Sequence, residues 1–121
     1  MEEKDCIFCK IVAGEIPSER VYEDDNFIGI LDINPHTKGH TLVIPKKHYT
    51  TLLDAPSSLL GEFLDAGKKV ALNLINKEKA EGFNLIMSNF EVAQQEVPHV
   101  HLHVVPRRKG DGKFKFLKSE K

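Results

Sequence analysis

The residues of this chain best suited to chemistry lie near its C-terminus, where histidines alternate with apolar residues. The alternating residues are His99, Val100, His101, Leu102, His103 and Val104. Successive residues of a β-strand point to opposite faces, so this pattern predicts three imidazoles on one face, roughly 6.6 Å apart, and a buried apolar face behind them. A single exposed histidine is usually ordinary surface, but three in five residues opposite a strictly apolar face indicate a site.

Such a row of imidazoles supports two kinds of chemistry, and the spacing does not separate them. The three rings could hold a metal ion, or one neutral imidazole could attack phosphorus. Histidine suits phosphoryl or nucleotidyl transfer because it titrates near neutral pH, attacks without first losing a proton and forms a labile phosphoramidate. The neighbouring rings can donate hydrogen bonds to the phosphate oxygens.

The two cysteines of the chain, Cys6 and Cys9, form a second candidate site with Cys-x-x-Cys spacing. In a reducing compartment this spacing favours metal binding or redox chemistry over a structural disulfide. The spacing alone leaves open a metal pair, a redox pair and two thiols without a role.

The elements that must position these residues follow from periodicity and turn signals. Helical spacing predicts a short helix from Ile7 to Val12 and a long one from Pro56 to about Lys79. The apolar stripe predicted for the long helix contains Leu60, Phe63, Leu64, Gly67, Val70, Ala71, Leu74 and Ile75. Short segments rich in β-formers predict strands at Arg20–Tyr22, Asn26–Asp32, His40–Pro45, Phe83–Ser88 and Val97–Val105. The expected fold class is α+β, with about five antiparallel strands and the two helices.

Size and composition limit the kind of protein this is. A chain of 121 residues fits a single domain, with a core at about residues 6–106 and a C-terminal tail at 107–121 that we expect to be mobile except where Phe114 and Phe116 find a surface. A net charge of -1 favours a small ligand over a nucleic acid polymer. With no signal-like segment and no apolar run long enough to cross a bilayer, we expect a cytoplasmic protein without a membrane partner.

An ordered series of motifs resembles the histidine-triad (HIT) family, whose signature is His-x-His-x-His followed by two hydrophobic residues. The matching segments, between Cys6 and about Pro106, include Ile7–Ile11, Glu15–Ser18, Tyr22–Asp25, Gly39–His48 and Gln95–Val97. The resemblance implies the HIT fold. It also implies that His101 is the catalytic nucleophile and that His103 helps to hold the phosphate.

The same resemblance implies a nucleotide site, with Asp32 accepting hydrogen bonds from the ribose hydroxyls. The residues that match the apolar pocket for a purine base are Ile7, Phe8, Ile11, Ile30 and Ile33. The residues that match the phosphate-contacting loop are Asn89, Gln95, Glu96 and Val97. This loop departs from the family pattern, because residues 90–94 contain none of the usual glycines. His40 matches a position near the triad, as a hydrogen-bonding partner or a ligand contact, and His36 has no assigned role.

The resemblance further implies a structural zinc ion, because zinc-bearing relatives use a Cys-x-x-Cys pair and two histidines. The matching ligands here are Cys6, Cys9, His48 and His99. Four protein ligands leave no open position, as in structural zinc sites, so His99 would take no direct part in the reaction. Family likeness also implies a homodimer formed through the long helix and the strand that follows it.

These expectations favour a hydrolase or transferase acting at the α-phosphorus of nucleoside phosphoramidates or other AMP derivatives, through a covalent nucleotidyl-histidine. The alternatives are a diadenosine polyphosphate hydrolase, a low-turnover zinc-stabilised nucleotide-binding regulator, and a metalloenzyme that holds one metal with all three histidines.

Overall fold

The computed structural model describes residues 5–112. The helices are α1 (Ile7–Val12), α2 (Ser57–Lys77) and the 3₁₀ turns η2 (Leu52–Asp54) and η3 (Glu91–Ala93). The strands are β1 (Arg20–Glu23), β2 (Phe27–Leu31), β3 (Thr41–Pro45), β4 (Gly82–Ile86) and β5 (Leu102–Arg107). This is the expected α+β fold, with one short and one long helix. No helix in this part of the chain combines the length and apolar character needed to cross a membrane.

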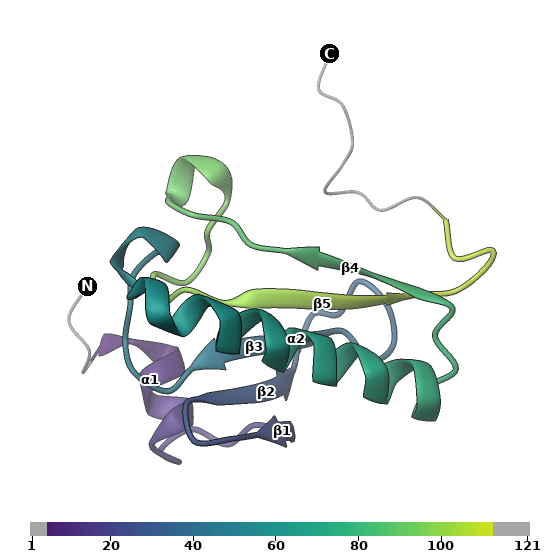
Figure 1. The fold of residues 1–121 in the computed structure, drawn as a ribbon, viewed down its shortest axis with the longest axis horizontal. Coiled ribbons are helices and arrows are strands. Elements are labelled where there is room, and N and C mark those ends of the chain that lie inside the picture. The colour runs from purple at the N-terminus through teal and green to yellow at the C-terminus, as the bar shows by residue number, and fades with distance from the viewer. Residues whose placement is uncertain (1–4, 113–121) are drawn as a thin grey trace.

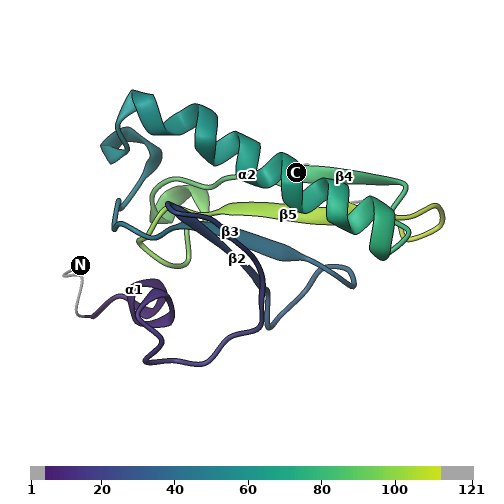
Figure 2. The same ribbon diagram turned by 60° about the horizontal axis from the view of Figure 1, so that its bottom comes forward.

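The five strands form one antiparallel sheet in the order β1-β2-β3-β5-β4. The long helix α2 connects β3 to β4 at the far edge, and β5 then inserts between them (Figure 1). Figure 2 shows α1 and α2 on opposite sides of the sheet. The topology therefore places β5, which follows the histidine segment, in the interior of the sheet.

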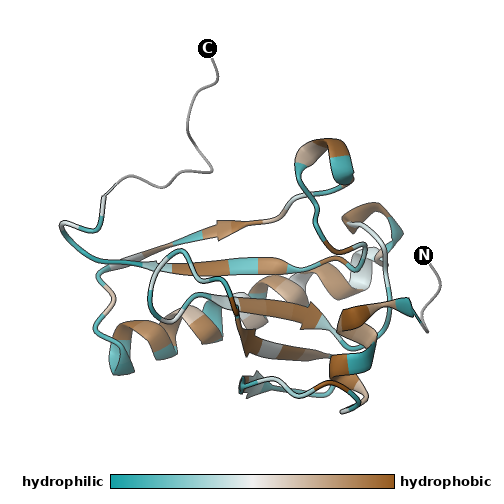
Figure 3. Ribbon diagram, turned by 180° about the vertical axis from the view of Figure 1, so that it is seen from behind, coloured by the Kyte–Doolittle hydropathy of each residue, from teal (hydrophilic) through white to brown (hydrophobic). Residues whose placement is uncertain are grey.

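Two apolar clusters cover the two faces of the sheet, and the alternation of side chains along each strand divides them. On the α2 face, Phe27 and Val43 pack with Val100, Leu102 and Val104 under the helix. On the α1 face, the strands contribute Ile28, Ile30, Leu42 and Ile44. In Figure 3 the central strands are largely brown, the colour of hydrophobic residues. The predicted apolar face opposite the histidines is confirmed, because Val100, Leu102 and Val104 are all buried.

The strand predicted at Val97–Val105 is wrong at both ends. Residues 97–101 are irregular, and β5 begins only at Leu102 and continues to Arg107. The amide of His99 bonds to the carbonyl of Val97 at 2.8 Å, and the amide of Val100 bonds to the carbonyl of Tyr49 at 2.7 Å. These bonds turn the chain out of the sheet, so only His103 of the three histidines belongs to a strand.

The long helix also differs from its predicted stripe. It ends at Lys77 rather than near Lys79, and its buried residues are Phe63, Ala66, Gly67, Val70, Ala71 and Leu74. Leu60, Leu64 and Ile75 are exposed instead. Gly67 faces the sheet, where a Cβ atom would lie 2.8 Å from Leu102 Cδ2, so the glycine allows close packing of α2 on β5.

The first residues of the predicted mobile tail are held by hydrogen bonds. Arg107 belongs to β5 and contacts Asp111 and Asn84, and Arg108 donates to the carbonyls of Lys38 and Glu78. The strand β5 therefore extends one residue into the predicted tail, and residues 107–112 contact the folded domain. Phe114 and Phe116 lie outside the described residues.

The loop between β4 and the histidine segment has glycine-like backbone angles without glycine. Phe90 has φ 76° and ψ 151°, and Gln94 has φ 74° and ψ 28°. Such conformations cost non-glycine residues on the order of 1–3 kcal/mol, and they persist only where the surroundings impose them. Gln95 supplies that constraint, because its buried side chain accepts from the amide of Phe90 and donates to the carbonyls of Thr50 and Val97.

Replacing Gln94 by glycine is expected to raise the free energy of unfolding by about 0.5–1 kcal/mol, because the side chain is exposed and only its backbone strain is removed. Urea unfolding measures the change. The matched control is Ala93→Gly in the adjacent turn, which is expected to lower stability by a similar amount. An equal loss of unfolding free energy in both variants would show that the backbone of Gln94 is not strained.

Candidate active site and metal site

His101 is held with one particular ring nitrogen in a hydrogen bond. Its Nδ1 lies 2.8 Å from the backbone carbonyl of His99. Because a carbonyl oxygen only accepts, Nδ1 carries the proton and the lone pair of neutral His101 is on Nε2. Burial lowers the pKa of this ring below its ordinary value, more than the His99 carbonyl and the charges of Asp32 and Glu96 raise it. The neutral, nucleophilic form is thus favoured near neutral pH.

A chain of hydrogen bonds fixes the neighbouring ring, His103, in the opposite tautomer. The backbone amide of His36 donates to His40 Nδ1 at 3.1 Å, so the proton of neutral His40 is on Nε2. His40 Nε2 lies 2.9 Å from His103 Nδ1 and donates to it. His103 therefore carries its own proton on Nε2, where the ring acts as a hydrogen-bond donor.

Burial keeps these two rings neutral. Desolvation is the largest cause of the lowered pKa of His40 and of His103. For His103 the pKa falls to about 4, and the nearby rings His101 and His40 contribute to this, since a second positive charge there would be repelled. The charge of Asp32, whose Oδ2 lies 3.5 Å from His40 Nε2, acts in the opposite direction and raises the pKa of His40.

Asp32, His40 and His103 also have the composition of a metal site, with ligand atoms within 4.8 Å of one another. The tautomer of His40 argues against that interpretation. A histidine that binds metal through Nε2 carries its proton on Nδ1, and here Nδ1 faces the amide proton of His36. We therefore interpret this group as a hydrogen-bonded relay.

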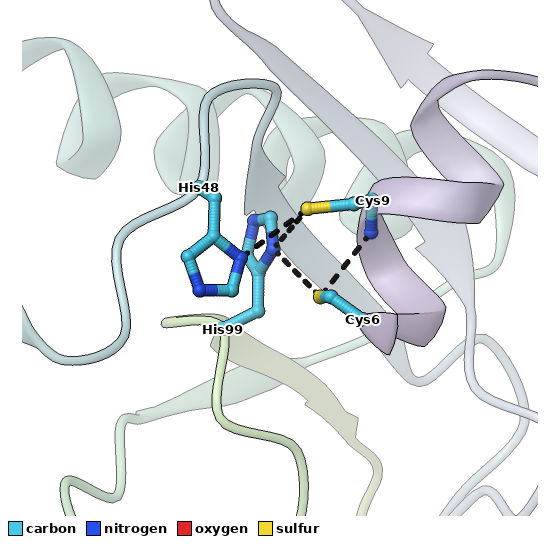
Figure 4. Close-up of side chains that lie close together, drawn as sticks. All are labelled: Cys6, Cys9, His48 and His99. Carbon is cyan, nitrogen blue, oxygen red and sulfur yellow. Dashed lines mark hydrogen bonds between the residues drawn. The ribbon is translucent and has the colours of Figure 1, made fainter. Parts of the chain in front are cut away.

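A second group of side chains does fit a metal ion. Cys6, Cys9, His48 and His99 place four ligand atoms within 4.8 Å of one another (Figure 4). Nδ1 of His99 lies 3.2 Å from Cys6 Sγ and 3.5 Å from Cys9 Sγ, and His48 Nδ1 lies 3.2 Å from Cys9 Sγ. A tetrahedral zinc ion with ordinary Zn–S and Zn–N bonds separates such atoms by about 3.6 Å.

A hydrogen bond orients His99 for metal binding. His99 Nε2 donates to the carbonyl of Pro45 at 2.8 Å, which leaves the lone pair of Nδ1 directed at the thiols. Burial lowers the pKa of His99 to about 4, so the ring is neutral, as a metal ligand must be. Donor set, distances and tautomer together fit a closed Cys₂His₂ zinc site.

The residues predicted to surround a base are only partly brought together. Phe8 and Ile11 are buried on α1 and pack with Ile30 on the α1 face. Phe8 also packs edge-on against His101, with ring centroids 5.1 Å apart. Ile7 is 45% exposed at the surface of α1, and Ile33 is 92% exposed and lies in neither apolar cluster.

The loop residues predicted to contact phosphates have structural contacts as well. The side-chain oxygen of Asn89 accepts from the amide of Leu52 at 2.7 Å, and Gln95 braces the loop as described above. Val97 packs against the α1-face cluster, while Glu96 is exposed and close enough to His101 to raise its pKa.

Sequence reasoning missed the backbone groups that set the tautomers. These are the carbonyls of Pro45 and His99 and the amide of His36. No side-chain pattern encodes them, because any residue type supplies the same amide and carbonyl.

Comparison with known proteins finds relatives that match most of this chain. The HIT domain family matches residues 13–110. An uncharacterized HIT-like protein of Methanocaldococcus jannaschii is 50% identical over 107 residues, which are 88% of this chain and 82% of that protein. The adenosine 5'-monophosphoramidase of Saccharomyces cerevisiae is 42% identical over 103 residues, 85% of this chain and 63% of the yeast enzyme.

Among solved structures, a zinc-bound histidine triad family protein from Mycobacterium smegmatis superimposes with a TM-score of 0.87 at 46% identity, covering 91% of this chain and 80% of that one. Because the family model spans most of the chain and a relative is 50% identical over 107 residues, this protein belongs to the histidine-triad (HIT) family.

Proposed function

We propose that this protein hydrolyses nucleoside phosphoramidates or related AMP derivatives, or transfers their nucleotidyl group, through a covalent intermediate on His101. The observation that carries the proposal is the bond from His101 Nδ1 to the His99 carbonyl, which leaves Nε2 as the nucleophilic atom. The yeast relative named adenosine 5'-monophosphoramidase supports the substrate class.

In the first step, Nε2 of His101 attacks the α-phosphorus, the bond to the leaving group breaks, and the leaving amine takes a proton from solvent water. His101 becomes a cation as the N–P bond forms. The His99 carbonyl, 2.8 Å from Nδ1, stabilises that charge through its dipole. The Nε2 proton of His103 donates to a non-bridging phosphate oxygen, where negative charge develops.

In the second step, water attacks the phosphorus of the nucleotidyl-histidine, the N–P bond breaks and His101 returns to its neutral form. The proton lost by water balances the proton that the leaving amine took. The relay from His36 and His40 keeps His103 a donor in both steps, because its Nδ1 stays occupied as an acceptor.

The nucleotide would lie against the α1 face of the sheet. Phe8, Ile11 and Ile30 offer an apolar wall for the base, with Ile7 at its rim. Asp32, half-buried beside His40, would accept the ribose hydroxyls. The loop at Asn89 and Gln95–Val97 would present backbone amides to the phosphates.

The variants His101→Ala and His101→Asn are expected to reduce hydrolysis of adenosine phosphoramidate by about 10⁴-fold or more, and to abolish any nucleotidyl-protein adduct trapped by acid quench. His101→Asn keeps a donor for the His99 carbonyl, so its fold and AMP binding should be retained. His103→Gln should reduce the rate of hydrolysis less, by about 10²–10³-fold. An adduct that still forms in His101→Ala would refute the assignment of His101 as the nucleophile. If the wild-type protein cleaves diadenosine polyphosphates faster than adenosine phosphoramidate, that result would favour the polyphosphates as the substrate class.

We also propose that Cys6, Cys9, His48 and His99 hold a structural zinc ion. The ion would link the start of α1 to the histidine segment and to the loop after β3, which are distant in sequence. Bound at this site, zinc supplies folding energy and no open position for substrate.

Protein purified without chelators is expected to contain about one zinc ion per chain by elemental analysis, and Cys9→Ala should remove it. Removal should lower the melting temperature, since a metal present at 100 times its dissociation constant stabilises by about 2.7 kcal/mol. Asp32→Asn is the control and should keep its zinc. Two zinc ions per wild-type chain, one of them lost in Asp32→Asn, would contradict our interpretation of the relay.

A homodimer is the proposed assembly, formed through β4 and α2. The edge strand β4 exposes Phe83 and Leu85, at 41% and 37%. Leu85 lies beside Gly67 of α2, and the same helix exposes Leu64 at 58%. An apolar surface next to an open sheet edge is what a two-fold interface buries.

Leu64→Glu is expected to shift the protein from dimer to monomer in sedimentation at low micromolar concentration, because it places a charge in the apolar surface. Leu53→Glu changes a leucine on η2 that is 80% exposed, against 58% for Leu64, and should leave the dimer intact. A wild-type mass equal to one chain, with or without AMP, would refute the assembly.

A further inference from the structure

Cys6 and Cys9 take no part in the proposed attack on phosphorus, yet they flank a residue that touches the nucleophile. Phe8 stands between them, and its ring packs edge-on against His99 and His101, with centroids 5.8 Å and 5.1 Å away. The thiol cluster and the active site therefore share one side chain as well as the peptide carbonyl of His99.

The position of α1 depends on its attachments, because a helix of six residues is too short to be stable alone. At its C-terminal end, Arg20 donates to the carbonyls of Ile11 and Val12. In the middle, Phe8 and Ile11 pack on the sheet. At its N-terminal end, the cluster of Cys6, Cys9 and the two histidines fastens it. Loss of that cluster would release the end that carries Phe8.

The two sulfurs are placed for reaction with each other. Their Sγ atoms lie within 4.8 Å, and a disulfide needs about 2.05 Å, which side-chain rotation can provide. Cys6 is fully buried, whereas Cys9 is partly exposed and within reach of a small oxidant. Figure 4 shows both sulfurs turned toward the rings of His48 and His99.

We propose that Cys6 and Cys9 are an oxidation site for hydrogen peroxide, whose disulfide product expels the metal and releases α1 from the nucleotide site. This inference rests on the proposed zinc site. The Cys9 thiolate attacks peroxide, the O–O bond breaks, and with one proton water leaves, which gives a sulfenic acid. The Cys6 thiolate then attacks the Cys9 sulfur, the S–O bond breaks and, with a second proton from solvent, a second water leaves. Two electrons pass from the sulfurs to peroxide, and zinc departs as Zn²⁺.

The consequence for the reaction follows from His99. With zinc bound, its ring is held at Nδ1 by the metal and at Nε2 by the Pro45 carbonyl, so its own carbonyl stays in place for His101. After oxidation the Nδ1 anchor is lost, and Phe8 leaves the edge of His101. Turnover is expected to fall by about 10- to 100-fold, as when supporting contacts of a metal site are removed.

The test treats the zinc-loaded protein with hydrogen peroxide and follows zinc release with a chromogenic chelator, thiol loss with a disulfide reagent, and intact mass. The expected result is zinc release in step with thiol loss, and a mass decrease of two hydrogen atoms from the protein. Dithiothreitol and added zinc should restore metal content and turnover. Zinc that stays bound after the thiols react, or a product that gains oxygen atoms without a disulfide, would overturn the proposal.

The matched variant is Cys9→His, which keeps four nitrogen and sulfur ligands but has no second thiol. It should keep its zinc under conditions that strip the wild type, and release at the wild-type rate would overturn the disulfide step. The second variant, His48→Ala, keeps both thiols and should lose zinc faster than the wild type. Wild-type protein with no zinc before peroxide contradicts the metal site itself, whereas zinc-loaded protein that resists peroxide contradicts only the oxidation.

Discussion

The hydrogen bond between His101 Nδ1 and the carbonyl of His99 is the interaction on which the rest of this site depends. It selects the tautomer of the nucleophile, and it stabilises the charge that the ring acquires. For that carbonyl to stay fixed, His99 must itself be held, and its ring is held by the Pro45 carbonyl and by the thiol cluster. The sheet supplies the remaining constraint, because Val100 and Leu102 on either side of His101 are buried under α2.

The two reactive rings receive opposite tautomers by the same means. A backbone acceptor places the proton of His101 on Nδ1, and a backbone donor at His36 places that of His103 on Nε2 through His40. Burial lowers the pKa of His40, His101 and His103, so the tautomers are those of neutral imidazoles. One ring thereby presents a lone pair to phosphorus and the next presents a proton to its oxygen.

The fold class, the five strands and the apolar face behind the histidines could be predicted from sequence, because alternation at Val100, Leu102 and Val104 reflects burial directly. The start of β5 could not, because the bond from Val100 to the Tyr49 carbonyl is a long-range contact without a local signal. Leu64 and Ile75 belong to the predicted apolar stripe of α2 but are exposed, since a helix pattern alone does not distinguish a buried core from an apolar surface. The glycine-like angles at Phe90 and Gln94 arise from the brace at Gln95 rather than from local propensity. The roles of the site residues stay predictions.

The most direct measurement of the central claim is long-range ¹H–¹⁵N NMR of the imidazole nitrogens in the zinc-loaded protein at neutral pH, which assigns the tautomer of each ring. The account predicts that His101 is protonated on Nδ1 with an unprotonated Nε2, and that His103 is protonated on Nε2 with Nδ1 as acceptor. A His101 ring protonated on Nε2, or present as imidazolium at that pH, would contradict it.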